Sequence, residues 1–181
     1  MHELVQFKTG APLVRRAVPD DATPLAALEA RLFLQAFGPA NHPDDLRMHL
    51  EQTFSPEKQL AEIADPARVV WIAEDGEGQA VGYAMLRVGD AEPAVVGERP
   101  AEVQRIYADA EFHGRGVGAA LMNACVERAL ALGCDVIWLG VWERNPRAIA
   151  FYQKMGFAAV GAHTFLLGRD LQQDLVMSRA L

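Results

Sequence analysis

The sequence feature that most constrains this chain is a group of glycines between a strand and a long apolar helix. Segment 103–108 is rich in residues that favour a buried strand, and three glycines follow it: Gly114, Gly116 and Gly118. Glycine at a helix start tolerates unusual backbone angles and lets a ligand approach the main chain. A helix start also presents unpartnered N–H groups and the positive end of the helix dipole. The sequence therefore predicts an anion site here, and phosphate is the anion we expect.

The helix after the glycines is predicted to be covered on most sides. Between positions 117 and 132 only three side chains are strongly polar, and such a narrow polar stripe is typical of a largely buried helix. Gly133 is its expected C-terminal cap. The apolar run 136–141 comes next, so the order strand, helix, strand predicts a right-handed crossover with parallel pairing.

Two other phosphate-binding signatures fit less well. A P-loop needs Lys followed by Ser or Thr after its glycines, and no such pair follows here. Gly114, Gly116 and Ala119 match the dinucleotide fingerprint, with Asp135 near the position of its ribose-binding acid. However, residues 109–112 separate strand from glycines, and Asp135 precedes the next apolar run instead of following it. We therefore disfavour the dinucleotide interpretation.

A second motif lies downstream, between residues 145 and 157. Asn145 is a good helix N-cap and Pro146 a good first helical residue. Gly156 followed by apolar Phe157 is typical of a Schellman helix end. The residues between these caps are predicted to form a compact helix that carries Tyr152.

Together the two motifs resemble those of the GCN5-related N-acetyltransferases. The phosphate signature of that family is Val-x-Val, four residues, then Arg/Gln-x-x-Gly-x-Gly/Ala. Here Ile106 and Ala108 fill the strand positions and Gly116 and Gly118 the glycines, whereas His113 stands where Arg or Gln is usual. The run Asn-x-x-Ala-x-x-Phe-Tyr-x-x-x-Gly-Phe from position 145 is similar to the second family hallmark, at the usual distance. The resemblance covers about residues 13–180.

The resemblance implies an α/β (α+β) fold: a mixed, mostly antiparallel central sheet of about seven strands with helices on both faces. It also implies a single N-acetyltransferase domain over residues 1–181, in which residues 1–12 are either a flexible N-terminus or an extension of the first strand. Local patterns add a strand at 13–17, a helix from 19 to 37, a helical segment at 43–64 broken at Ser55-Pro56, and a hairpin of 69–74 and 80–88.

The resemblance further implies acetyl-coenzyme A as cosubstrate and no metal. Main-chain N–H groups around the glycines would hold the pyrophosphate, and the strand edge before them would pair with the pantetheine amides. Asn145 would be a helix cap, a coenzyme contact or both, and Lys154 either reaches a phosphate or is a solvated surface lysine. The expected cofactor-binding residues are Ile106, Tyr107, Ala108, His113, Gly114, Arg115, Gly116, Val117, Gly118, Ala119, Asn145 and Tyr152.

In the chemistry that the resemblance implies, Tyr152 meets the departing thiolate, and an ordinary core tyrosine is the less favoured alternative. Because the ordinary pKa of tyrosine is about 10 and that of a thiol about 8.5, a hydrogen bond is favoured over full proton transfer. A primary ammonium with a pKa of about 10.4 is neutral roughly once in 2,500 at pH 7, a deficit of about 4.6 kcal/mol. A base must therefore help. We rank Glu102 and Glu143 before Asp109, and each could also be an ordinary surface acid.

Charge and local sequence bear on the acceptor. The formal net charge is −7, which makes nucleic acid and anionic membranes poor partners and suits a cationic acceptor. Gly140-Val-Trp-Glu143 and His163-Thr-Phe165 are similar to the bacterial spermidine/spermine N-acetyltransferase branch. That similarity implies a small-molecule amine acceptor, with polyamines first. His163 is then either a site residue or a histidine whose hydrogen bonds are made within the sheet.

Other functions stay open. The same coenzyme motifs would serve a protein or peptide N-acetyltransferase, and a non-catalytic acetyl-coenzyme A-binding module is the alternative from a different class. Cys125 and Cys134 are read as small core residues in a reduced setting. The N-terminal residues lack a targeting pattern and no apolar run reaches membrane-spanning length, so we expect a cytoplasmic monomer or homodimer.

Overall fold

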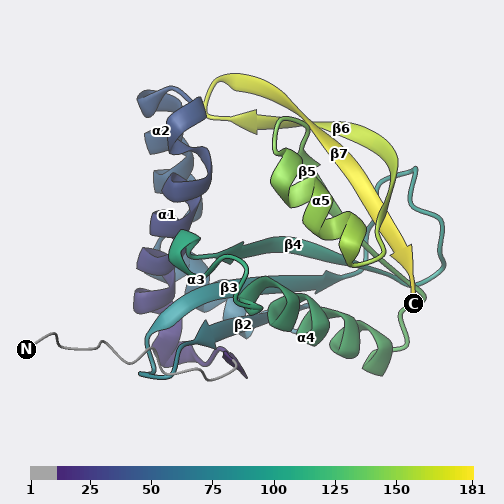
Figure 1. Cartoon of the computed structure of the whole chain (residues 1–181), viewed down its shortest axis with the longest axis horizontal. Coiled ribbons are helices and arrows are strands. Elements are labelled where there is room, and N and C mark those ends of the chain that lie inside the picture. The colour runs from purple at the N-terminus through teal and green to yellow at the C-terminus, as the bar shows by residue number, and fades with distance from the viewer. Residues whose placement is uncertain (1–11) are drawn as a thin grey trace, which may run out of the picture.

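The computed structural model describes residues 12–181, and in them one seven-stranded sheet is covered by helices on both faces (Figure 1). The strands lie in the order β1-β2-β3-β4-β5-β7-β6, and all neighbours are antiparallel except β4 and β5. The strands are β1 (Leu13–Arg16), β2 (Arg68–Glu74), β3 (Ala80–Val88), β4 (Pro100–Ala108), β5 (Val136–Trp142), β6 (Ala158–Leu167) and β7 (Asp170–Ala180). The helices are α1 (Ala22–Phe37), α2 (Pro43–Thr53), α3 (Pro56–Ala64), α4 (Val117–Ala131) and α5 (Pro146–Lys154).

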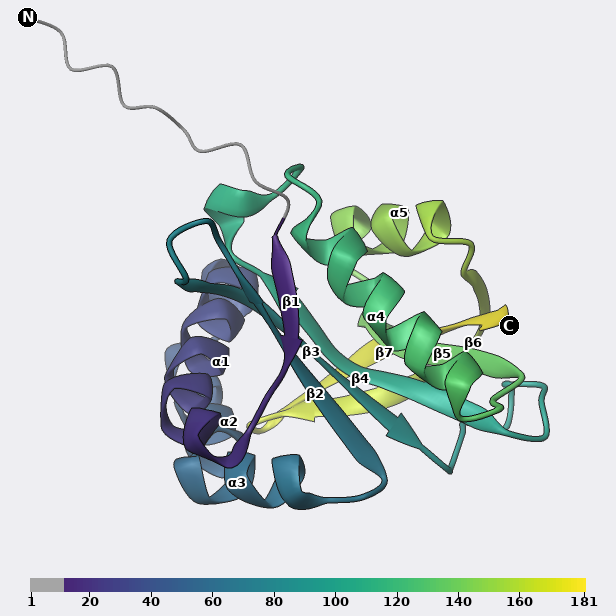
Figure 2. The same ribbon diagram turned by 90° about the horizontal axis from the view of Figure 1, so that it is seen from below.

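The two faces of the sheet carry separate parts of the core. Figure 2 shows α1, α2 and α3 on one face and α4 and α5 on the other. Successive strand residues point to opposite faces, so Trp71 of β2 packs in the core with α4, whereas Val70 and Ile72 pack in the core with α1. Two buried faces explain why β2 and β3 are continuous apolar runs without polar alternation.

The predicted mixed, mostly antiparallel sheet with helices on both faces is confirmed. The helical segment 43–64 breaks at the predicted place, where the Ser55 hydroxyl accepts a hydrogen bond from the N–H of Lys58 (3.4 Å). The predicted parallel pairing is also present, since Pro100–Glu102 pair with Val136–Trp138. β4 begins at Pro100, three residues before the predicted strand start at 103. Apart from Pro12, the N-terminal segment 1–12 lies outside the described residues.

The hairpin of β6 and β7 reaches across to α2. The carboxylate of Asp45 on α2 accepts hydrogen bonds from the backbone N–H (3.0 Å) and Nε (3.2 Å) of Arg169 in the hairpin turn. Gly168 in the same turn has a φ of +60°, and a Cβ there would lie 2.5 Å from the Cα of Asp45. Glycine therefore allows this close approach of turn and helix.

We expect Gly168→Ala to lower the free energy of unfolding by roughly 2–4 kcal/mol, from the left-handed backbone and the clash with Asp45. Urea unfolding followed by circular dichroism measures it. Gly78→Ala is the matched control, because Gly78 has a φ of +81° but no atom within 4 Å of its added Cβ. Equal losses in the two variants would contradict the proposed clash.

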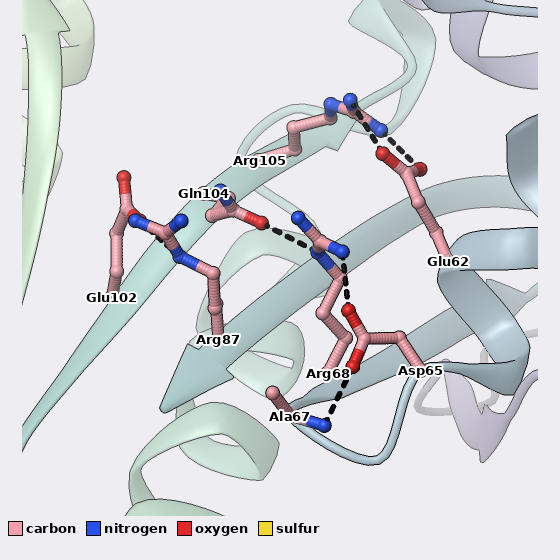
Figure 3. A network of polar contacts seen from close by, with 8 residues as sticks. All are labelled: Glu62, Asp65, Ala67, Arg68, Arg87, Glu102, Gln104 and Arg105. Atoms are coloured by element: carbon pink, nitrogen blue, oxygen red, sulfur yellow. Dashed lines mark hydrogen bonds and ion pairs between the residues drawn. The ribbon is translucent and has the colours of Figure 1, made fainter. Parts of the chain in front are cut away.

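A polar cluster is buried beneath α1 and α3. Arg105 of β4 makes two contacts to the carboxylate of Glu62, at 2.7 and 3.0 Å (Figure 3), and its Nη1 lies 3.7 Å from Glu29. Glu29 is 1% exposed. Burial raises the pKa of Glu29 to about 8 despite the opposing effect of Arg105. The carboxyl group of Glu29 is therefore mostly protonated and uncharged at neutral pH.

Stability should fall with rising pH because of Glu29. Its folded-state pKa exceeds the reference value of 4.5, so the unfolded chain binds fewer protons between about pH 4.5 and 8, and folding loses stability across that window. We expect Glu29→Gln, relative to the wild type, to gain roughly 2–4 kcal/mol between pH 5 and 8.5. Urea unfolding at both pH values tests this, with exposed Glu77→Gln as control. A constant difference between the Glu29 variant and wild type would refute it.

Candidate active site

The start of α4 forms an open cradle of main-chain N–H groups. Gly116 is its N-cap with a φ of +87°, and Gly114 has a φ of +76°. The first helical bond runs from the N–H of Ala120 to the carbonyl of Gly116 (2.9 Å), so the N–H groups of the preceding turn have no acceptor within the helix. A Cβ at Gly114 or Gly116 would meet no atom within 4 Å. The space in front of the cradle is therefore free for an anion such as phosphate.

The third glycine brings the two motifs together. A Cβ on Gly118 would lie 3.3 Å from the ring of Phe151 on α5. Gly118 thus lets the first turn of α4 pack closely against the helix that carries Tyr152. The motif glycines have different tasks, because two open the cradle and one sets its distance from α5.

His113 and Arg147 border the cradle. The ring of His113 is hydrogen-bonded through Nε2 to the carbonyl of Ala108 (2.9 Å), and burial, followed by the charge of Arg147, lowers the pKa of His113. His113 is therefore a neutral donor that ties the cradle to the end of β4. Arg147, at the start of α5, is a cation beside the cradle that the sequence motifs did not single out. Asn145 caps α5 by accepting from the N–H of Ala148 (3.1 Å), so the predicted cap is present.

Strands β4 and β5 separate in front of the cradle. Their pairing ends at Glu102 and Trp138. Farther along, Ile106–Ala108 pair with β3 on one side, and no described strand pairs with them on the other. The edge predicted to meet the pantetheine amides is thus available in β4, although the Ala108 carbonyl is already taken by His113. The side chain of Tyr107 points away from α4 and packs on α1 residues.

Tyr152 of α5 is buried in the part of the core that α4 and α5 share with the sheet. Its ring contacts Phe151 (centroids 5.3 Å apart) and Phe157 (6.2 Å), and the described residues provide no hydrogen bond to its hydroxyl. Burial, then the nearby Tyr107 and Cys125, raise the pKa of Tyr152 well above its ordinary value. The phenol therefore stays protonated and is able to donate a hydrogen bond.

The predicted base candidates lie in three different environments. Glu102 is paired with Arg87 at 2.8 Å (Figure 3), and burial raises the pKa of Glu102. Glu143 is exposed after β5. Asp109 is buried against Arg31 and accepts from the N–H of Glu111 (3.2 Å); burial opposes ionisation, but these partners lower the pKa of Asp109. Asp109 is thus a structural carboxylate.

Two acidic residues that the sequence did not single out flank His163. Nδ1 of His163 lies 2.8 Å from Glu92, in the loop before β4, and Nε2 lies 3.7 Å from Asp174 of β7. Burial raises the pKa of Asp174. Glu92 and Asp174 are far apart in sequence and carry no motif, so only the pairing of β6 with β7 and the path of the loop reveal them.

Aromatic side chains line the face of the sheet that lies opposite α4. Phe37 of α1 lies with its ring centroid 5.9 Å from Trp142 and 6.3 Å from Tyr107. These rings lie over the side of β4 and β5 opposite α4. An amine that reaches the thioester from this side would therefore meet aromatic surface together with carboxylates.

Other surface features lie elsewhere. One hollow of about 550 Å³ lies between β1, β2 and α4, and another of about 510 Å³ lies between α2 and the hairpin turn. The carboxylate of Asp135 accepts hydrogen bonds from the backbone N–H groups of Glu98 (2.9 Å) and Arg99 (3.0 Å). Asp135 therefore holds the loop that precedes β4. In residues 12–181, no three or more His, Cys, Asp or Glu side chains are grouped so that they could hold a metal ion. No helix in that range is long and apolar enough to span a membrane.

An open turn of main-chain N–H groups, a parallel strand pair that separates beyond Glu102 and a buried phenol form an arrangement suited to a coenzyme A-dependent acyltransferase. Comparison with known proteins agrees. The sequence profile described as the acetyltransferase (GNAT) family matches residues 31–157. An uncharacterized N-acetyltransferase of Lactobacillus delbrueckii subsp. lactis is 34% identical over 173 residues, 96% of this chain and 99% of that protein. An uncharacterized N-acetyltransferase of Mycobacterium bovis is 37% identical over 161 residues, which cover 89% of this chain and 98% of that protein.

The fold has close structural counterparts. The PaiA N-acetyltransferase of Thermoplasma acidophilum, solved in complex with coenzyme A, superposes with a TM-score of 0.75 at 17% identity, over 95% of this chain and all of that one (100%). The chain belongs to the GNAT acetyltransferase family and is an acetyl-coenzyme A-dependent N-acetyltransferase.

Proposed function

We propose that this enzyme acetylates a primary amine of a small cationic molecule, with polyamines such as spermidine and spermine as the leading acceptors. The observation that carries the proposal is the set of carboxylates on the sheet face opposite α4. Glu92, Glu102 and Asp174 lie around His163 beside the point where β4 and β5 separate. Such a surface attracts an ammonium and disfavours an anionic acceptor.

The cradle fits the cosubstrate. The N–H groups of the first turn of α4 would hold the pyrophosphate, and the open space at Gly114 and Gly116 accommodates it. His113 would keep the cradle in place through the Ala108 carbonyl, and Arg147 would add positive charge beside the phosphates. The free edge of β4 at 106–108 would then direct the pantetheine arm toward the gap between β4 and β5.

The reaction would proceed across the sheet. The amine enters from the aromatic face and attacks the thioester carbonyl, so a C–N bond forms and the C–S bond breaks with its electron pair on sulfur. Tyr152, protonated and on the cradle side, donates a hydrogen bond to that sulfur. After burial, Tyr107 is the largest cause that raises the pKa of Tyr152, and Asp174 adds to the effect of burial in raising the pKa of Tyr107. Tyr107 therefore lies within electrostatic range of groups on both sides of the sheet.

A panel of amines tests the acceptor class. We expect thiol release from acetyl-coenzyme A to be at least tenfold faster with spermidine or spermine than with single amino acids, because several ammonium groups can meet the carboxylates. Aminoglycosides are also polycations, so their rate shows whether a bulky acceptor is used as well. Raising the salt concentration should weaken this preference. Release with an N-terminal peptide but not with polyamines would replace the proposal by a peptide N-acetyltransferase.

A further inference from the structure

His163 is held in one orientation by two carboxylates. Its Nδ1 lies 2.8 Å from Oε1 of Glu92, and an ionised carboxylate can only accept a hydrogen bond. Nδ1 must therefore carry the proton. In the neutral ring Nε2 is then the unprotonated nitrogen with a free lone pair, the state that a proton acceptor requires.

The lone pair of Nε2 faces a second acceptor. Oδ2 of Asp174 lies 3.7 Å from Nε2, and both atoms lie close to the backbone of Gly140, where a Cβ would be 2.9 Å from Nε2 and 3.5 Å from Oδ2. Two acceptors at this separation repel each other unless a donor lies between or beside them. An ammonium N–H supplies such a donor. Glycine at position 140 leaves the room that this arrangement needs.

This pair of acceptors lies beside the opened part of the sheet. Gly140 is two residues beyond Trp138, where the pairing of β4 with β5 ends. Asp174 is in register with Trp142 and with His163. His163 is 26% exposed and Asp174 15%, so both can be reached from solvent. The buried indole Nε1 of Trp138 has no hydrogen-bond partner among the described residues.

We propose that Nε2 of His163 removes the proton from the acceptor ammonium, with Asp174 as the second hydrogen-bond acceptor of that ammonium and Glu92 as the positioning residue. The inference rests on the proposed function, because it requires an amine acceptor. One proton passes from R–NH3+ to Nε2, which leaves the nitrogen lone pair free to attack the thioester carbonyl. When the C–S bond breaks, the nitrogen still carries two protons: one stays in the amide, the other is released to solvent and replaces the proton with which the thiolate leaves as a thiol, and His163 returns its own proton to water.

The other acids serve this role less well. The carboxylate of Glu102 is held by Arg87 at 2.8 Å, and Glu143 is exposed beyond the end of β5. The charged groups that face His163 are Glu92 from the loop, Asp174 from β7, Glu102 from β4 with Arg87 of β3, and Glu143 near Asp174. Most of these groups are carboxylates, which attract the acceptor ammonium toward His163.

Kinetics against pH distinguish a base from a structural histidine. The acceptor is spermidine, or whichever amine of the panel turns over fastest. We expect His163→Gln to lower kcat/KM about 100-fold at pH 7.5, with the calorimetric affinity for acetyl-coenzyme A unchanged. The deficit should shrink to tenfold or less at pH 9.5, because an amine with a pKa near 10.4 then loses its proton unaided far more often. A deficit that is absent, or equal at both pH values, would overturn the proposal.

Matched variants sharpen the test. Thr164→Val, an exposed neighbour on the same strand, should leave kcat/KM within about twofold. Glu92→Gln should lower kcat/KM less than His163→Gln does and show the same recovery at high pH. If Glu102→Gln instead reproduces the pH-dependent loss while His163→Gln does not, Glu102 is the base.

A spectroscopic measurement separates this inference from the acceptor proposal. Nitrogen-15 NMR of the wild type, with the His163 signal assigned by comparison with His163→Gln, should show protonated Nδ1 and unprotonated Nε2 at pH 8. Glu92→Gln should shift that balance. This result does not depend on the amine chosen, so failure of every polyamine would leave it measurable. Observation of the Nε2–H form would overturn the assignment of His163 as base.

Discussion

Replacing Tyr152 by Phe should lower kcat roughly 10²- to 10³-fold while leaving the affinity for acetyl-coenzyme A nearly unchanged. The substitution removes one hydroxyl from a buried ring that keeps its contacts with Phe151 and Phe157. Because burial raises the pKa of Tyr152, the phenol is a donor at every pH at which the enzyme works. Without it the thiolate departs into an apolar site with no partner. Stopped-flow measurement of thiol release and calorimetry of coenzyme binding check the two halves of this expectation.

The control is a second buried tyrosine. Tyr83 is fully buried and its hydroxyl has no hydrogen-bond partner among the residues described, so Tyr83→Phe should change kcat by less than about twofold. A Tyr152→Phe enzyme that turns over as fast as the wild type would show that another group assists the thiolate. Equal losses in both variants would indicate a general effect of removing a core hydroxyl.

Much of the fold was predictable because local signals and tertiary structure agree. The apolar runs of β2 and β3 and the caps of α5 are set by residues within a few positions of one another. The Schellman end of α5, for example, forms as expected, with the N–H of Phe157 donating to the carbonyl of Tyr152 (3.0 Å). The start of β4 was missed, since Pro100 and Glu102 do not look like strand residues until β5 pairs with them.

The cradle was predictable for the same reason, whereas the acceptor side was not. The glycines before α4 act through their own main chain, so sequence spacing alone describes them. The environment of His163 depends on Glu92 and Asp174, which come from a loop and a strand on either side of it in sequence. Periodicity carries no information on such contacts. The sequence could therefore rank Glu102 and Glu143 only by their positions, at the start of the central strand and after the next strand.

Replacing Gly116 by Val should weaken the binding of acetyl-coenzyme A by roughly 100-fold or more. Gly116 has a φ of +87° and opens onto space with no atom within 4 Å, which is where the pyrophosphate is proposed to lie. A branched side chain would fill that space and force the backbone out of the left-handed region. Loss of one or two charge-assisted hydrogen bonds, each about 1.5–3 kcal/mol, accounts for the expected loss of affinity.

Gly78→Val controls for backbone strain, since Gly78 has a φ of +81° in the turn between β2 and β3. Calorimetric titration of acetyl-coenzyme A should give a wild-type dissociation constant for the Gly78 variant and a weaker one for the Gly116 variant. Titration of 3′-dephospho-coenzyme A should show the same ratio between wild type and Gly116→Val, because the pyrophosphate is common to both ligands. If Gly116→Val binds acetyl-coenzyme A as tightly as the wild type, the main-chain N–H groups at the start of α4 cannot hold the diphosphate, and the route of the pantetheine arm along β4 would have to be redrawn.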